Sequence, residues 1–173
     1  MDAGHFPGMV LAILQIVTVL VLCIAMTMSL AHALEFPGKL RLSKDDYFII
    51  QQIYYPGFTF GGAAEPVAIA LLVVLLLVVP PATPGFWLTA FALLATAALH
   101  ATYWLVTHPV NRAWVKNLDM GGLGTEFFGT GSASRRELTW IELRDRWEYS
   151  HLLRALLAFA ALAAMVVSLR ISP

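Results

Sequence analysis

The chain has 173 residues, of which 59% are hydrophobic and 13% are charged, and its 11 basic and 11 acidic residues give no net charge. Soluble domains carry about 25% charged residues, and a neutral chain offers no electrostatic basis for nucleic-acid binding. The composition therefore predicts an integral membrane protein with no nucleic-acid partner.

Four apolar runs are long enough to cross a hydrocarbon core of about 30 Å. Pro37 is expected to end the first run and Pro109 the third, because the residue before a proline disfavours helical geometry. The runs predict an all-α, four-helix transmembrane bundle in which residues 1–173 form a single domain. The predicted helices cover residues 9–35, 63–79, 86–108 and 140–169.

Between the first two runs, the sequence predicts a short interfacial helix. Ser43 followed by Asp46 resembles a capping box, and Pro56 ends the segment. The stretch is too short to span a membrane, and its tyrosines suit headgroup depth. A second capping box, Thr139 with Glu142, is expected to begin the last helix.

Lysine and arginine gather in the loops at one end of the bundle, whereas the other end holds only Arg170. Cytoplasmic loops are enriched in these residues. We therefore expect a multi-pass protein of the plasma (inner) membrane with both termini outside the cytoplasm. The residues that favour this orientation are Lys39, Arg41, Lys44, Arg112, Lys116, Arg135, Arg136, Arg144 and Arg146.

Histidines and glutamates lie near the end of the first and third runs and near the start of the second and fourth. In an up-and-down bundle, these positions share one end. Ionisable groups inside a membrane cost roughly 2.5–3.5 kcal/mol each and are functional candidates by default. The sequence thus predicts one buried site facing the cytoplasm, built from His32, Glu35, Glu65, His100, His108, Glu148 and His151.

One interpretation of this set is a metal centre. Glu148 and His151 form a Glu-x-x-His pair on one helix face, as in di-iron and di-manganese carboxylate bundles. Iron, manganese, copper and zinc all accept imidazole, and carboxylate suits several of them. The predicted ligands are His32, Glu35, Glu65, His100, Glu148 and His151.

Two other interpretations stay open. The glutamates could pair with Arg146, Arg154 or a histidine as a polar clamp at the membrane surface. Alternatively, histidine and glutamate could act as acid and base in a small-molecule pocket, with His32 and His151 as catalytic candidates. In such a pocket Tyr54 and Trp104 would contact an apolar ligand or cofactor, unless they form an ordinary aromatic belt, and Arg154 would balance carboxylate charge.

Several segments together resemble a known group of proteins: His32-Ala-Leu-Glu35-Phe-Pro37-x-Lys39, Gln51-x-x-Tyr54, His108-Pro109-Val110-Asn111 and Arg146-Trp147-x-x-x-x-His151-x-x-Arg154. They are similar to bacterial four-helix membrane proteins near the anthrone-oxygenase-like family, and the layout also resembles DoxX-type proteins. The resemblance implies oxygenase chemistry on an apolar aromatic molecule. It adds His108 and Asn111 to the catalytic candidates.

The sequence therefore predicts a membrane oxidoreductase or oxygenase-like protein that acts on an apolar or aromatic small molecule. Two rivals remain: a non-catalytic subunit of a larger membrane complex, and a lipid- or quinone-binding protein. Small residues in the third and fourth helices permit close helix packing, either within one chain or in a homo-oligomer.

Overall fold

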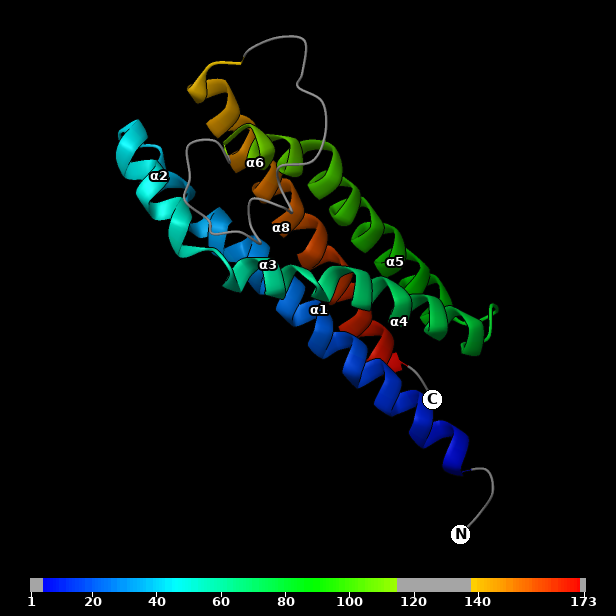
Figure 1. The fold of residues 1–173 in the computed structure, drawn as a ribbon. Helices are drawn as coiled ribbons and strands as arrows, with labels where there is room; N and C mark the ends of the chain where they lie inside the picture. Colours follow the sequence, from blue (N-terminus) through cyan, green and yellow to red (C-terminus); the bar gives the residue numbers. More distant parts are fainter. Residues whose placement is uncertain (1–4, 115–137, 172–173) are drawn as a thin grey trace.

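The computed structural model describes residues 5–114 and 138–171, and every element in these ranges is helical (Figure 1). This confirms the predicted all-α bundle. The elements are α1 (His5–Lys39), α2 (Lys44–Ile53), α3 (Gly57–Gly62), α4 (Ala64–Val78), α5 (Pro84–Thr102), the π-helix η1 (Tyr103–Thr107), α6 (His108–Trp114) and α8 (Trp140–Ile171).

Four helical segments of the described chain are long and apolar enough to cross a membrane. They are Gly8–Lys39, Gly57–Val78, Pro84–Trp114 and Trp140–Ile171. Each turns large apolar side chains outward, such as Leu20, Leu77, Leu94 and Leu156, which are 58–81% exposed. Because lipid tails are the only solvent that suits such a surface, the protein is a multi-pass membrane protein.

The four long segments form a closed ring in which α1 and α5 each pack against both α4 and α8 (Figure 1). The centre of the ring is filled by leucines and by small residues, including Ala68, Ala92 and Ala161. Small residues let helix backbones approach closely where water provides no driving force. The start of α1 and the end of α8 lie at one end of the bundle, while α2 and α6 lie at the other (Figure 1).

Helix α1 continues past its predicted end at Glu35 and stops only at Lys39. The prediction was wrong because Pro37 removes just one hydrogen bond, to the Ala33 carbonyl, and the next turn is restored by the Leu40 N–H donating to Phe36. The extra turn has a consequence for the site. It places Lys39 on the same helix face as His32 and Glu35.

The third spanning segment also passes through its predicted stop at Pro109. Helix α5 widens into η1, where the His108 N–H bonds to the Tyr103 carbonyl five residues back, and α6 then runs on to Trp114. A π-helical turn loosens the backbone, which accommodates a proline that cannot donate. Because the helix continues, Asn111 and Trp114 extend the third spanning segment beyond Pro109.

Both predicted N-caps form, and the second of them is a complete capping box. The Ser43 hydroxyl accepts from the Asp46 N–H and begins α2. Thr139 and Glu142 bond reciprocally at the start of α8. Helix α2 packs through Tyr47 onto Trp114, with ring centroids 5.6 Å apart. The predicted short helix between the first two spans is confirmed, and it covers one end of the bundle.

Candidate functional site

A cavity of about 350 Å³ lies at the end of the bundle that holds α2 and α6. Its volume falls in the range of roughly 300–1,000 Å³ that small-molecule sites occupy. Most of its wall is apolar or aromatic, and α1, α2, α3, α4, α5, η1, α6 and α8 all contribute to it. All but three of the predicted site residues line it: His32, Tyr54, Glu65, His100, Trp104, Asn111, His151 and Arg154.

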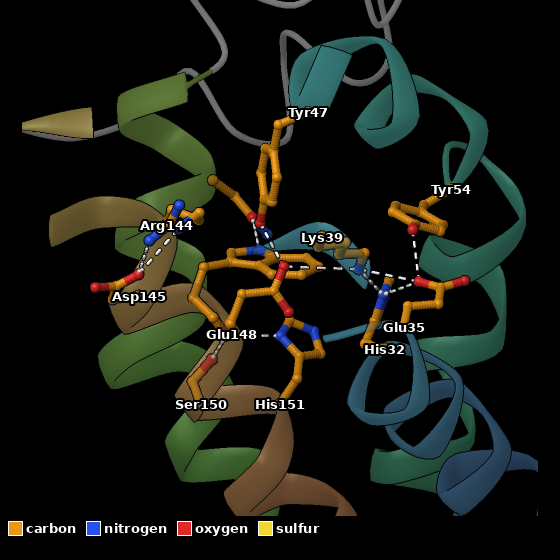
Figure 2. A network of polar contacts seen from close by, with 12 residues as sticks. His32, Glu35, Lys39, Tyr47, Tyr54, Arg144, Asp145, Glu148, Ser150 and His151 are labelled. Atoms are coloured by element: carbon orange, nitrogen blue, oxygen red, sulfur yellow. Dashed lines mark hydrogen bonds and ion pairs between the residues drawn. The ribbon is translucent and has the colours of Figure 1, made fainter. Parts of the chain in front are cut away.

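A buried lysine organises one side of this site, as Figure 2 shows. The Lys39 Nζ lies 2.9 Å from Glu35 Oε2, 3.8 Å from Glu148 Oε1 and 3.3 Å from His32 Nδ1. It also lies over the rings of Tyr54 and Trp147, at 4.7 and 4.8 Å from their centroids. One ammonium thus joins the end of α1 to α8 and to the residue that follows α2.

Two tyrosine hydroxyls each donate a hydrogen bond to one of the carboxylates beside Lys39 (Figure 2). Tyr47 donates to Glu148 Oε1 at 2.6 Å, and Tyr54 donates to Glu35 Oε2 at 2.5 Å. Burial, together with Glu148, raises the pKa of Tyr47 well above its usual value of 10.0, and burial with Glu35 does the same for the pKa of Tyr54. Both phenols therefore stay protonated and act as donors at physiological pH.

Two histidines from opposite helices meet beside the cavity. The rings of His32 on α1 and His151 on α8 have centroids 4.4 Å apart and are inclined by 73°. Trp147 stacks on His151 with centroids 3.9 Å apart and donates from Nε1 to Asn111 Oδ1 at 2.7 Å. Aromatic rings therefore enclose both imidazoles.

The hydrogen-bond network assigns a different tautomer to each histidine. His151 Nδ1 faces the Trp147 carbonyl at 2.9 Å, so it carries the proton, and its Nε2 accepts from Arg154 at 3.1 Å. His32 Nδ1 lies 3.3 Å from the Lys39 ammonium, which can only donate, and 3.6 Å from Glu35 Oε2, which is beyond hydrogen-bond distance. His32 therefore carries its proton on Nε2, and that atom has no hydrogen-bond partner among residues 5–114 and 138–171.

A second polar group lies next to His151. Arg154 donates to Glu65 Oε1, and the His100 Nδ1 lies 3.0 Å from Glu65 Oε2. Trp104, which is 46% exposed, donates from Nε1 to His100 Nε2 at 2.9 Å. Glu65 and Arg154 are almost fully buried, so this pair carries a desolvation cost that only its own contacts offset.

The six predicted metal ligands are thus divided between two groups. Glu35 and Glu148 surround Lys39, whereas Glu65 binds Arg154 and His100. No three His, Cys, Asp or Glu side chains in the described part of the chain gather closely enough to hold a metal ion. The geometry gives the metal interpretation no support, and its test is elemental analysis. The polar-clamp interpretation agrees with these ion pairs, with Lys39 and Arg154 as the cations.

The two catalytic candidates implied by the family resemblance lie apart. Asn111 lines the cavity and orients Trp147. His108 is buried outside the cavity wall, against the rings of Tyr103 and Trp104 at 5.8 and 4.9 Å. Only Asn111 is placed to influence a molecule in the cavity directly.

Several residues of the site escaped the sequence analysis. Lys39 was noted as a loop cation and as part of a segment resembling a known family, but it was not placed in the site, because the predicted helix ended before it. Tyr47 resembled an interfacial anchor, and nothing in its local pattern indicated a bond to Glu148, which lies 101 positions away. A signal did exist for Lys39: His32, Glu35 and Lys39 follow helical spacing if the helix continues through Pro37.

Comparison with known proteins adds no assignment: no family model matches the chain, and neither a curated protein nor a solved structure shows significant similarity to it.

Proposed function

We propose that the protein binds an apolar, aromatic small molecule in the cavity and acts on it as a membrane oxidoreductase or oxygenase. The observation that carries the binding proposal is the cavity itself, an aromatic-lined space of about 350 Å³ into which His32 faces with an unpartnered ring nitrogen. Apolar pockets with a few convergent polar groups are the usual sites of small-molecule binding.

The chemical part of the proposal rests on two supports. One is the resemblance of the His108–Asn111 segment and its neighbours to anthrone-oxygenase-like proteins. The other is the presence of a donor, His32 Nε2, that could polarise an oxygen of the ligand by hydrogen bonding. An oxygenase reaction requires dioxygen as the oxidant, so consumption of oxygen on addition of an aromatic ketone to the reconstituted protein is its direct assay.

A glycine pair tests the binding proposal. Gly57 and Gly62 both belong to α3, and a Cβ added at either meets nothing within 4 Å, but only Gly62 lines the cavity. In Gly62→Leu the new side chain should occupy the cavity and weaken binding of the tricyclic hydrocarbon fluorene at least tenfold. Gly57→Leu should bind like wild type. Equal binding by wild type and Gly62→Leu would refute the cavity as the binding site.

A lipid-soluble quinone bound without turnover is the second candidate. Part of the cavity wall belongs to exposed positions of the membrane-spanning segments, including Pro66 and Trp104. A ligand dissolved in the bilayer could enter between these residues. Extraction of the purified protein with organic solvent, followed by mass spectrometry, would detect a retained quinone, and the absence of oxygen consumption would favour this candidate over the enzyme.

We also propose that the cavity end of the bundle faces the cytoplasm of a bacterial inner membrane, because the loop cations gather there. A reporter enzyme that is active only outside the cytoplasm, fused after Pro173, should be active. An inactive fusion with normal expression would invert the orientation.

A further inference from the structure

The Lys39–His32 contact has a chemical consequence for the ligand. An ammonium group has three donors and no acceptor, so Nδ1 of His32 accepts in its 3.3 Å contact with Lys39 Nζ, while Glu35 Oε2 lies farther from the same nitrogen, at 3.6 Å. The proton of the neutral imidazole must then be on Nε2. His32, on α1, therefore presents an N–H donor to the cavity, and not a basic lone pair.

The position of Lys39 is well constrained (Figure 2). Its side chain is 4% exposed, Glu35 and Glu148 lie on either side of it, and the rings of Tyr54 and Trp147 pack against it. These four contacts come from α1, from α8 and from the residue after α2. An ammonium held this way cannot turn away from His32 without losing several charge-assisted contacts.

A second, independent observation also indicates that the cavity wall is rich in hydrogen-bond donors. Three other nitrogens of cavity-lining side chains are buried without a hydrogen-bond partner among the described residues: Gln51 Nε2, Trp114 Nε1 and Arg154 Nε. Their side chains are 8%, 2% and 6% exposed. All three are donors, and a buried donor left unpaired is unfavourable. Among the described residues, the buried unpaired atoms that belong to cavity-lining side chains are thus all donors, and none is an acceptor.

We propose that Lys39 is a positioning residue that fixes the Nε2–H tautomer of His32, and that the site thereby selects ligands whose aromatic body carries a hydrogen-bond-accepting oxygen such as a carbonyl. The inference rests on the proposed cavity function and narrows its ligand class. His32 donates to the carbonyl oxygen, while the aromatic wall of the cavity contacts the rest of the ligand. No covalent step is part of the inference.

The test combines a spectroscopic measurement with a binding measurement on the full-length protein in nanodiscs. Nitrogen-15 chemical shifts of histidine rings distinguish the two neutral tautomers, and loss of a resonance in His32→Phe assigns His32. Wild type should show the Nε2–H form, Lys39→Met should lose that preference, and Lys39→Arg should restore it because arginine is also a donor without an acceptor. Lys44→Met, a change at an exposed lysine, is the matched control.

Binding is measured with 9-fluorenone and fluorene, which share a ring skeleton and differ in one carbonyl oxygen. Wild type should prefer fluorenone by about tenfold, the order expected from one hydrogen bond in a desolvated site. Lys39→Met and His32→Phe should lose that preference while still binding fluorene, and Lys39→Arg should keep it. Should Lys39→Met fail to fold, Lys39→Gln replaces it, because an amide can also accept and no longer constrains Nδ1.

Each outcome separates this inference from the proposed function. Equal binding of the two probes by wild type, or an Nδ1–H tautomer of His32, would overturn the inference and leave the cavity as a binding site. A Lys39→Met variant with unchanged tautomer and unchanged preference would show that Lys39 has no positioning role. Failure of wild type to bind either probe would overturn the proposed function, and the inference with it.

Discussion

His32 and His151 touch edge to face across the bundle, with centroids 4.4 Å apart, and their neighbours assign them opposite tautomers. The two rings are alike chemically, yet Lys39 makes one present an Nε2–H, while the Trp147 carbonyl and Arg154 engage both nitrogens of the other. His151 is therefore a structural link between its own helix and the Arg154–Glu65 pair. His32 is the imidazole left with a free donor toward the cavity.

The buried pair of Arg154 and Glu65 should dominate the stability of this end of the bundle. Arg154→Met leaves the Glu65 carboxylate buried with only His100 as a partner, and losing one member of a buried ion pair costs about 3–5 kcal/mol. Unfolding in mixed micelles should show a loss of that size. Arg170→Met, at an exposed position near the end of α8, should change the free energy of unfolding by less than about 0.5 kcal/mol.

Combining Arg154→Met with Glu65→Gln removes both charges and should recover much of that loss, because no unpaired charge then remains buried. If the double variant is as unstable as the sum of the two single variants, the two residues do not stabilise each other. The same cycle measures their coupling energy directly.

Tyr47→Phe tests the hydroxyl that supports Glu148. The change removes the 2.6 Å hydrogen bond and leaves a fully buried carboxylate oxygen without this donor, at a cost of about 1–3 kcal/mol. Tyr149→Phe, at a residue 61% exposed, is the control and should be nearly neutral. If Tyr47→Phe leaves the free energy of unfolding unchanged, Lys39 alone is sufficient to stabilise the Glu148 carboxylate.

Stability should also fall at alkaline pH. Burial and Glu148 raise the folded-state pKa of Tyr47 above its usual value of 10.0, and burial and Glu35 raise that of Tyr54. A raised folded pKa gives stability that is fully present below the unfolded pKa and is lost as pH rises toward the folded pKa. Unfolding free energy should therefore decline above about pH 10, and less steeply in Tyr47→Phe. An equal slope in both proteins would contradict this assignment.

The contact between α1 and α3 provides a packing test. A Cβ at Gly61 would overlap the Met28 side chain, whereas a Cβ at Gly57 meets nothing within 4 Å. Gly61→Ala should therefore destabilise by about 1–3 kcal/mol through overpacking, and Gly57→Ala should not. Adding Met28→Ala should relieve the clash. If Gly61→Ala is harmless on its own, Met28 can move aside without loss.

Much of this fold could be predicted because a membrane span is recognised from the apolar composition of a long stretch of residues, and not from the identity of any single residue. Four apolar runs and two capping boxes gave the helices and their order. The ends were predicted less well: Pro37 and Pro109 were expected to stop helices, but each removes only one backbone bond, and in the second case η1 makes room for the ring. Local rules for proline are outweighed where neighbouring helices hold the segment in place.

The sequence predicted most of the residues that belong to the site, but not which of them bond to one another. Histidines and glutamates near one end of each run do converge, because the up-and-down topology requires it. Which carboxylate pairs with which cation depends on side-chain direction over distances that sequence spacing does not constrain. Glu148 binds Tyr47 and Lys39, and Glu65 binds Arg154, a division between two groups that the metal interpretation did not anticipate.

The metal content of the purified protein distinguishes the polar-clamp interpretation from the metal-centre interpretation. Since Lys39 and Arg154 already compensate the carboxylates, we expect elemental analysis of the detergent-purified protein to find iron, manganese, zinc and copper well below one atom per chain. Stoichiometric metal in wild type that is lost in His151→Ala would show that the ligands rearrange around an ion, and would restore the metal-centre interpretation.

Photolabelling with benzophenone tests the central claim most directly, because this aromatic ketone inserts into nearby C–H bonds when irradiated. Two methionines of α1 serve as matched reporters: Met28 lines the cavity, while Met9 is 53% exposed on the outer face. The account predicts adducts at Met28 and other cavity residues, saturable by fluorenone and lost in Gly62→Leu. Adducts at Met9 and other outward-facing positions alone, unaffected by fluorenone, would contradict it.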